Sequence, residues 1–259
     1  MKVFIMGGEG FVGSAFVRQC EARKLDWEAV ELGNYERFKG QSCDLLVNAA
    51  GNSKKYLANE DPVRDFDYSL KALLRSFEDF QFSSYVYISS IDVYSDHSHP
   101  EKNREDAEID ISALSHYGFH KFLGENMVRH HLSRWLILRL GGVLGPGLKK
   151  NPVYDLLHDV PLRVNEESRY GYIATDTAAA FVLDLAETDR ENEIFNCCGT
   201  GTVSIREIRE WLKKPLRYHG EALPVERYEI NNGKLRSLFD VPESRPTARR
   251  FIDSFENEN

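Results

Sequence analysis

Tyr117, Lys121 and Glu125 follow one another at intervals of four residues in the segment HYGFHKFLGE, residues 116–125. Residues four apart lie on the same face of an α-helix. A tyrosine has a pKa of about 10, but a nearby ammonium group stabilises the phenolate and lowers that pKa. The spacing therefore predicts a helix on which Tyr117 exchanges protons and Lys121 tunes it. We expect Glu125 to be a partner for Lys121 or for a neighbouring basic side chain.

A Tyr-x-x-x-Lys pair also occurs in ordinary helices, where the tyrosine packs in the core beside a surface lysine. The catalytic interpretation is favoured by Ser90, which ends an apolar run in YISSIDVY. Open parallel sheets bind their ligands at the carboxyl ends of their strands. A hydroxyl there would hold a substrate oxygen while Tyr117 donates or accepts its proton during hydride transfer with a nicotinamide. Lys121 could also reach the nicotinamide ribose.

A glycine triplet, Gly7, Gly10 and Gly13, follows the first apolar run in MGGEGFVGS. Gly7 permits a tight turn, Gly10 lets the backbone approach a pyrophosphate, and Gly13 lets the next helix pack closely. The start of that helix offers N–H groups and a positive dipole end to phosphates. This pattern predicts a dinucleotide-binding loop. The alternative is a tight turn that only packs a helix on a strand.

Glu31 lies at the end of the second predicted strand, 18 residues after Gly13. A carboxylate there accepts hydrogen bonds from ribose hydroxyls and repels a 2′-phosphate. We therefore expect the cofactor to be NAD. A solvated charge at a strand end is the alternative for Glu31, and the nearby Arg37 keeps NADP open.

Predicted strands and helices alternate over the first 140 residues. Short apolar runs predict strands, and longer amphipathic segments predict helices. The predicted strands are residues 2–6, 27–32, 43–51, 85–90 and 134–140, and the predicted helices are residues 12–24, 62–80 and 113–133. This alternation predicts an α/β fold, a Rossmann-type doubly wound parallel sheet with helices on both faces.

The sequence changes in character after GGVLGPG, residues 141–147, where glycine and proline increase and the elements become shorter. We expect residues 1–147 to form the dinucleotide-binding domain. Residues 148–259 would form a small C-terminal substrate-binding lobe, with some of its segments returning to the sheet of the first domain. The later helices include one at residues 204–212 with Ser204 as its N-cap.

Composition excludes several other classes of function. The net charge of −8 repels phosphate backbones, so we expect no nucleic-acid partner. The most apolar run, WLILRLGGVLG, is broken by Arg139 and is too short to span a bilayer. The four cysteines form no Cys-x-x-Cys pair, which is typical of reduced thiols in a cytoplasmic protein. His97 and His99 lack nearby partners of metal-ligand type, so we expect no metal site.

The motifs GGEGFVG, VNAAG, YISSIDVY, YGFHKFLGE, LRLGGVLGPG, YIATDTAAA and FNCCGTGTVSIREI span most of the chain. In this order they resemble the extended short-chain dehydrogenase/reductases, in the NAD-dependent epimerase/dehydratase group that includes UDP-galactose 4-epimerase. The resemblance implies a catalytic trio of Ser90, Tyr117 and Lys121. It also implies an NAD cleft, and the further residues that we expect to line it are Phe11, Val12, Asn48, Ala49, Ala50 and Leu140.

Substrates in this group are most often nucleotide sugars, which implies reduction of a keto-sugar or epimerisation through oxidation and reduction. Dehydratases of the group place an Asp–Glu pair after the catalytic hydroxyl. Here those positions hold Ile91 and Asp92, so we do not expect dehydration. Ser69 and Gly142 stand where relatives commonly have asparagine, and the second lobe is short. Whether the substrate carries a nucleotide therefore stays open.

The resemblance also implies a homodimer, because the helices at 62–80 and 113–133 pair with their copies in this group. The alternative is that all their apolar side chains face the sheet. A rival function is a non-catalytic sensor that binds NAD(P) on the same fold. Sensors can dispense with the tyrosine or the lysine, and this chain has both.

Overall fold

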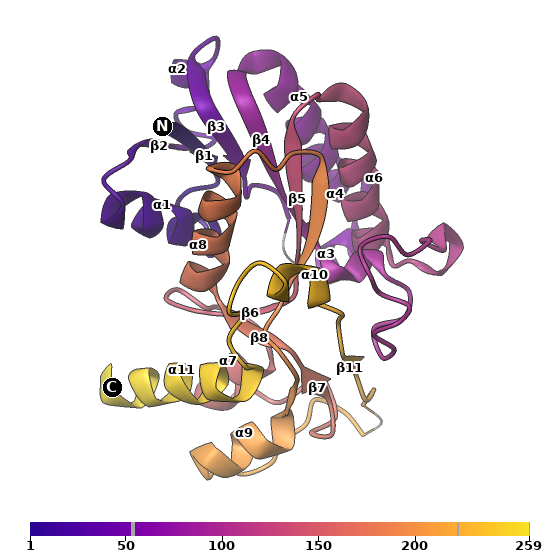
Figure 1. Ribbon diagram of the computed structural model, residues 1–259. Coiled ribbons are helices and arrows are strands. Elements are labelled where there is room, and N and C mark those ends of the chain that lie inside the picture. Colours follow the sequence, from indigo (N-terminus) through magenta and orange to yellow (C-terminus); the bar gives the residue numbers. More distant parts are fainter. Residues whose placement is uncertain (53–54, 222, 259) are drawn as a thin grey trace. The chain divides into compact units, whose positions relative to one another are not determined.

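The computed structural model describes residues 1–52, 55–221 and 223–258, and it divides into two compact units (Figure 1). Unit 1 comprises Met1–Ser95, Glu105–Leu140 and Asp176–Asn196, and unit 2 comprises Asp96–Arg104, Gly141–Thr175 and Cys197–Asn259. Each unit therefore collects segments that lie far apart in the sequence. The assignment of residues 1–147 and 148–259 to two domains stays a prediction.

Unit 1 is built on a six-stranded sheet with strand order β2-β1-β3-β4-β5-β9. The strands are β1 (Lys2–Met6), β2 (Asp26–Val30), β3 (Ser42–Asn48), β4 (Gln81–Ser90), β5 (Trp135–Leu140) and β9 (Glu193–Cys197). The pairings among β1 to β5 are parallel, which confirms the predicted Rossmann-type fold. The order reverses at β1, because the chain continues to β2 on one side and to β3 on the other. Such a reversal is where doubly wound sheets bind ligands.

The helices of unit 1 cover both faces of this sheet. They are α1 (Gly13–Ala22), α2 (Tyr35–Phe38), α3 (Lys55–Glu60), α4 (Pro62–Phe66), α5 (Ala72–Asp79), α6 (His116–His131) and α8 (Thr175–Ala186). Helices α1 and α8 are joined by ion pairs, Arg18 to Asp176 at 2.8 Å and Arg23 to Asp184 at 2.6 Å. Helices α5 and α6 lie beside each other in Figure 1 and pack on the cluster of buried side chains described next.

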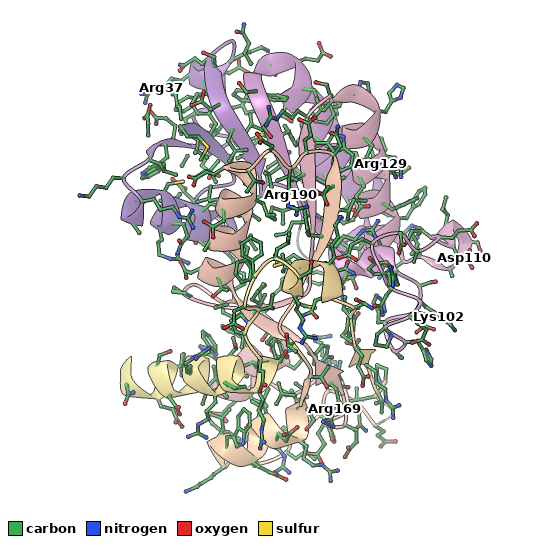
Figure 2. The ribbon with its side chains drawn as sticks, viewed as in Figure 1. Arg37, Lys102, Asp110, Arg129, Arg169 and Arg190 are labelled. Carbon is green, nitrogen blue, oxygen red and sulfur yellow. The ribbon has the colours of Figure 1, made fainter. Side chains whose placement is uncertain are left out.

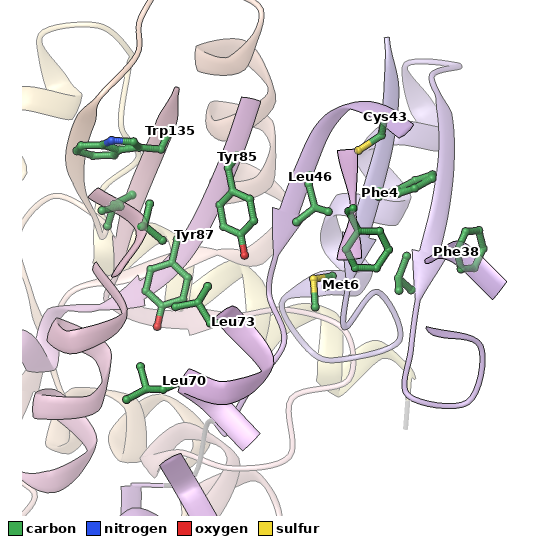
Figure 3. Packing of buried hydrophobic residues seen from close by; sticks show 14 residues of the cluster. Phe4, Met6, Phe38, Cys43, Leu46, Leu70, Leu73, Tyr85, Tyr87 and Trp135 are labelled. Carbon is green, nitrogen blue, oxygen red and sulfur yellow. The ribbon is translucent and has the colours of Figure 1, made fainter. Parts of the chain in front are cut away.

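Aromatic and aliphatic side chains fill the space between the sheet and α5 and α6 (Figure 3). The cluster includes Phe4, Met6, Leu46, Leu70, Leu73, Tyr85, Tyr87, Val128 and Ile137. Helix α6 approaches the sheet closely at Gly124, where a Cβ atom would lie 2.4 Å from the Tyr87 hydroxyl oxygen. A larger residue at Gly124 would therefore push α6 away from β4.

Several elements differ from the sequence prediction in their limits or in their internal geometry; β3, for example, ends at Asn48 and not at residue 51. The helix predicted at 62–80 is confirmed from Pro62 to Asp79, but its middle turn, η1 (Asp67–Lys71), is π-helical and joins α4 to α5. This turn has only five residues, which are too few for the apolar pattern to distinguish a π-helical turn from an α-helical one. Strand β4 begins at Gln81 rather than at residue 85, because its first residues are polar or half-exposed and lack the apolar run that marks a buried strand.

Unit 2 contains two small sheets and four helices among its described residues. Its strands are β6 (Gly142–Leu144), β7 (Arg169–Tyr170), β8 (Tyr172–Ala174), β10 (Val203–Ser204) and β11 (Arg227–Tyr228), and its helices are α7 (Pro152–Leu157), α9 (Ile205–Leu212), α10 (Gly233–Arg236) and α11 (Ser244–Glu258). The predicted N-cap Ser204 is confirmed, because its hydroxyl accepts the Glu207 N–H at 3.1 Å. Within the described parts of both units, no helix combines the length and apolarity that crossing a bilayer requires.

Glu125 and Arg139 form a buried ion pair between α6 and β5. The Arg139 guanidinium donates from Nε to Glu125 Oε1 at 3.0 Å and from Nη2 to Oε2 at 2.8 Å. Ser89 also donates to Glu125 at 2.6 Å, and Arg139 donates to the Tyr94 hydroxyl at 2.7 Å. The side chains of Glu125 and Arg139 are 0% and 3% exposed. The expected basic partner of Glu125 is therefore Arg139.

Removal of one member of this pair should strongly destabilise unit 1. We expect Glu125→Gln to lower the free energy of unfolding by about 3–5 kcal/mol, because it leaves the buried Arg139 cation without a counter-ion. Urea unfolding measures the loss. The surface pair of Arg134 and Glu191, at 45% and 48% exposure, provides the control. Glu191→Gln should cost less than about 1 kcal/mol, and equal losses in the two variants would contradict the prediction.

Candidate functional site

The glycine loop lies directly against the segment that follows β3. Gly7 has a φ of +73°, and a Cβ atom there would stand 3.0 Å from the Ala50 Cα atom. A Cβ atom at Gly13 would lie only 1.9 Å from the Gly7 carbonyl oxygen. Side chains are therefore excluded at both positions. The loop and residues 49–50 come together at the point where the strand order reverses, as expected for a dinucleotide site.

The first turn of α1 fits a pyrophosphate. No side chain caps the helix at Val12, and the first turn carries no acidic residue. The preceding Gly10 is exposed, so its backbone is accessible. An uncapped helix start offers N–H groups and a positive dipole end to a phosphate. Phe11 is half-buried beside this turn.

Asn48, Ala49 and Ala50 form the other wall of this region. The Asn48 amide nitrogen donates to the Tyr85 hydroxyl at 2.7 Å, and its amide oxygen accepts the Ala50 N–H at 3.1 Å. The Asn48 side chain is therefore used to shape the turn after β3. The backbone of Ala49 and Ala50 is the surface that meets the glycine loop. Leu140 lies at the end of β5, paired in register with Ser90.

Glu31 contacts the glycine loop through its carboxylate. Its Oε1 atom accepts the Glu9 N–H at 2.7 Å, and its own N–H donates to the Asn34 side chain at 2.7 Å. Arg37 lies on α2, labelled in Figure 2, with its guanidinium carbon 5.2 Å from the centre of the Phe38 ring. The side chain that contacts the glycine loop here is therefore the carboxylate of Glu31, rather than the guanidinium of Arg37.

Tyr117 is held at the end of β4 by the first turn of α6. Ser115 caps the helix by accepting the Gly118 N–H at 3.1 Å. A Cβ atom at Gly118 would lie 2.1 Å from the carbonyl oxygen of Asp92, so α6 rests directly on the turn after Ser90. The Tyr117 side chain is buried and shares a hydrogen bond with Ser90. The structure therefore brings Ser90 and Tyr117 into contact.

The environment of Tyr117 keeps its phenol protonated at neutral pH. Burial is the main cause of its raised pKa, and the negative charge of Asp92 raises it further. The positive charge of Lys55 and the hydrogen bond with Ser90 lower the pKa. Tyr117 in this state is equipped to donate a proton, and it would act as a base only with additional positive charge nearby.

Lys121 lies one turn after Tyr117 and is buried. Its Nζ atom donates to the Ile88 carbonyl oxygen at 3.0 Å and lies 6.0 Å from the centre of the Tyr117 ring. Burial lowers the pKa of Lys121 to about 8, against the opposing charges of Asp65 and Glu125. The spacing in the sequence places Lys121 next to Tyr117 as expected. The cation that lowers the pKa of Tyr117 here is nevertheless Lys55.

Three charged side chains around Tyr117 had no predicted role at the site. Lys55 Nζ donates to Asp92 Oδ1 at 2.7 Å. Asp65 on α4 lies 2.5 Å from His120 Nδ1 and accepts a hydrogen bond from Asn52 at 2.7 Å. Asp92 was visible in YISSIDVY, two residues after Ser90. Lys55 and Asp65 lie in segments that match no motif, so no local signal identified them.

Ser69 and Gly142, which stand where relatives commonly have asparagine, have different surroundings. The Ser69 hydroxyl, in the π-helical turn of unit 1, accepts the Asn52 N–H at 3.3 Å. Gly142, in unit 2, has a neighbour so close that a Cβ atom would lie 2.8 Å from the Gly171 carbonyl oxygen. An asparagine side chain has no room at Gly142 in this arrangement.

Several solved structures are similar to this chain. MoeE5 in complex with UDP-glucose and NAD is 17% identical, with a TM-score of 0.83 over 100% of this chain and 99% of that chain. A dTDP-4-dehydrorhamnose reductase from Clostridium acetobutylicum is 18% identical, with a TM-score of 0.80 over 99% and 100%. The UDP-glucose 4-epimerase of Thermus thermophilus in complex with NAD is 18% identical, with a TM-score of 0.74 over 97% and 99%. At these identities the likeness shows the fold.

Comparison with curated protein sequences finds no match. The family model described as "NAD dependent epimerase/dehydratase family" matches residues 3–198, which is more than half of the chain. This match covers the glycine loop, Ser90, Tyr117 and Lys121. The protein therefore belongs to the NAD-dependent epimerase/dehydratase family.

Proposed function

We propose that the protein is an NAD-dependent oxidoreductase or epimerase that acts on a hydroxyl or keto group of a sugar, carried by a nucleotide. The observation that carries this proposal is the contact of Ser90 with Tyr117 at the end of β4, one helical turn from Lys121. A phenol, a hydroxyl and an ammonium at one strand end suit proton transfer to and from a substrate oxygen. Bound NAD would supply the hydride acceptor, and its reduced form the donor.

Each member of the trio has a distinct proposed role. Ser90 holds the substrate oxygen next to the Tyr117 hydroxyl. Tyr117 donates its proton to a carbonyl oxygen that becomes an alcohol, and accepts the alcohol proton in the reverse direction. Lys121 binds the ribose of the cofactor. In its protonated form it also stabilises the phenolate of Tyr117.

NAD is the proposed cofactor, held by the glycine loop and by the uncapped start of α1. Gly10, Phe11, Val12 and Gly13 would face the pyrophosphate. Glu31 would accept hydrogen bonds from the adenosine ribose, and its charge would repel a 2′-phosphate. Ala49, Ala50 and Leu140 would line the remaining walls.

The proposal of a nucleotide sugar rests on the family and on what its structural neighbours bind. Their structures contain UDP-glucose or UDP-glucuronic acid together with NAD. The choice between epimerase and reductase is open to a direct measurement, because an epimerase returns the hydride and retains its cofactor. Identification of the nucleotide released from the purified protein would distinguish them. Retained NAD favours an epimerase, and an empty site favours a reductase.

The rival proposal is a sensor that binds NAD without turnover. The presence of both Tyr117 and Lys121 counts against it, because a buried ammonium lowers stability and a sensor could dispense with it. Homodimer formation is also proposed. It is supported by apolar side chains left exposed on α4, η1 and α5 of unit 1, namely Val63, Phe66, Tyr68 and Leu74 at 75%, 46%, 47% and 40%.

Tyr117→Phe should abolish catalysis while leaving cofactor binding intact. We expect turnover to fall by about 10²–10⁴-fold, because the variant lacks the group that transfers the proton. The assay uses NAD or NADH with UDP-glucose, UDP-galactose, UDP-glucuronic acid and dTDP-4-dehydrorhamnose. Tyr68→Phe, at an exposed tyrosine, should retain full activity. Full turnover in Tyr117→Phe would exclude the assigned role, and NAD binding without turnover of any of these sugars would favour the sensor.

NAD should bind more tightly than NADP, by about tenfold or more, because Glu31 repels the 2′-phosphate. Calorimetric titration of the cofactor-free protein measures both affinities. Glu31→Ser should reduce the preference, whereas Glu36→Ser, at an exposed carboxylate on α2, should not. Equal affinities in the unmodified protein would remove Glu31 from its assigned role.

Lys121→Met should stabilise the cofactor-free protein at neutral pH. The pKa of Lys121 is lowered to about 8 in the folded state, against about 10.4 in an unfolded chain. Between these values the unfolded chain binds more protons, so this group makes stability rise with increasing pH. Below about pH 8 the buried ammonium therefore lowers the free energy of unfolding. We expect Lys121→Met to raise the free energy of unfolding by about 1–3 kcal/mol near pH 7. The gain is reduced because the variant also loses the hydrogen bond from Lys121 to the Ile88 carbonyl oxygen.

Urea unfolding at neutral pH and at about pH 10 tests this linkage, because the gain should shrink at the higher pH. Lys71→Met is the matched control, since Lys71 pairs with Asp67 on the surface and is 54% exposed. It should change stability by less than about 0.5 kcal/mol. A Lys121→Met variant that is less stable than the parent near neutral pH would contradict the argument.

A further inference from the structure

Ser90, Asp92 and Lys55 form a continuous hydrogen-bonded chain beside Tyr117. Ser90 donates its hydroxyl proton to Asp92 Oδ2 at 2.9 Å and accepts the Asp92 N–H at 3.2 Å. Lys55 Nζ donates to the other carboxylate oxygen, Oδ1, at 2.7 Å. The Asp92 side chain is 10% exposed and that of Lys55 is 52% exposed. The chain thus runs from the buried end of β4 to a half-exposed lysine on α3.

The hydrogen bond to Asp92 decides how Ser90 faces its other neighbours. A serine hydroxyl has one proton and two acceptor lone pairs. The proton is directed at the carboxylate and one lone pair accepts the Asp92 N–H, so a single acceptor position of Ser90 is left, toward the protonated Tyr117 or a substrate alcohol. When Tyr117 ionises, the Ser90 proton must turn from Asp92 to the phenolate to form the hydrogen bond that lowers the pKa of Tyr117. To donate to a substrate carbonyl, Ser90 must break its hydrogen bond with Asp92. The pair of Asp92 and Lys55 therefore sets the direction of the hydrogen bonds at the site.

The turn that carries Asp92 packs directly against the start of the helix that carries Tyr117. Asp92 lies in the 3₁₀ turn η2 (Ile91–Val93) that follows β4. The first turn of α6 rests on this turn at Gly118, next to Tyr117, with no room for a Cβ atom. A carboxylate fixed at this position opposes the formation of a second negative charge on the phenol, and the ammonium of Lys55 offsets it.

Other charged or titratable groups also face Tyr117. They are Asp65 on α4, Lys121 on α6 and Tyr87 on β4. Among the charges that act on Tyr117, Asp92 raises its pKa most and Lys55 is the opposing cation. Removing the charge of Asp92 and removing the charge of Lys55 should therefore shift the ionisation of Tyr117 in opposite directions.

We propose that Asp92 and Lys55 are positioning residues of the proton-transfer centre: Asp92 orients the Ser90 hydroxyl, and Lys55 neutralises Asp92 so that Tyr117 can ionise. This inference rests on the proposed role of Tyr117. Neither side chain exchanges protons with the substrate in this scheme. An ion pair that only stabilises the fold would leave the ionisation of Tyr117 unchanged once the variant is folded.

The test is a titration of Tyr117 that requires no substrate. The protein is labelled with carbon-13 at the tyrosine Cζ atoms and saturated with NAD, and the Tyr117 signal is assigned by its absence in Tyr117→Phe. Its chemical shift is followed to the highest pH at which the fold persists. The variants are Asp92→Asn, Lys55→Met and the combination of both.

We expect Asp92→Asn to move the titration of Tyr117 toward lower pH by about one pH unit, since a like charge is removed. Lys55→Met should move its onset toward higher pH. Lys55→Met should shift the titration less in the Asp92→Asn background than in the parent, because Lys55 acts partly through Asp92. Where turnover is measurable, the pH dependence of the oxidation rate should shift in the same directions.

The control is the ion pair of Lys39 and Asp79, also in unit 1, at 3.1 Å and with side-chain exposures of 50% and 15%. Asp79→Asn should leave the titration of Tyr117 unchanged. The inference is overturned if the titration in Asp92→Asn begins no lower than in the parent, if both single variants shift it in the same direction, or if Asp79→Asn shifts it equally.

The titration separates this inference from the proposed function. Opposite shifts in Asp92→Asn and Lys55→Met support the positioning of Tyr117 even if none of the tested sugars is turned over, a result that would count against the proposed reaction alone. Turnover that depends on Tyr117, combined with an unshifted titration in Asp92→Asn, would support the proposed reaction and reject the role of Asp92.

Discussion

Helix α6 lies so close to β4 and to the turn after it that two positions on its inner face must be glycine. A Cβ atom at Gly118 would stand 2.1 Å from the Asp92 carbonyl oxygen, and one at Gly124 would stand 2.4 Å from the Tyr87 hydroxyl oxygen. This close packing places the polar face of the helix, from Tyr117 through Lys121, against the end of the sheet. A helix held farther away would leave these side chains in solvent, where their pKa values would stay near the ordinary ones.

The same packing buries several charges under the site, and their partners differ. Glu125 and Arg139 neutralise each other through hydrogen bonds from Nε and Nη2 of the guanidinium. Asp65 is paired with His120. Lys121 donates to a backbone carbonyl, and its pKa is lowered accordingly. A buried cation whose hydrogen-bond partner is neutral costs stability, and such a group is expected where a protein uses the charge.

Much of the architecture could be predicted from local patterns. Alternating apolar runs and amphipathic segments predicted the parallel sheet, because the periods of strands and helices differ. The glycine triplet predicted the turn between β1 and α1, and the structure shows why Gly7 and Gly13 admit no Cβ atom. The π-helical turn inside the helix at 62–80 was not predicted, because five residues are too few for the apolar pattern to distinguish it from an α-helical turn.

The sequence by itself determined which groups share a helical face, the order of the motifs, and the glycine triplet of the loop. Spacing along one helix is enough for this, because residues four apart are always neighbours. Only the tertiary structure decided that Glu125 pairs with Arg139, and that Lys55 pairs with Asp92 beside Tyr117. The reason is physical: the strength of an electrostatic interaction depends on distance and burial in space, and residues 37 positions apart in the sequence, as Lys55 and Asp92 are, become neighbours only when the chain folds.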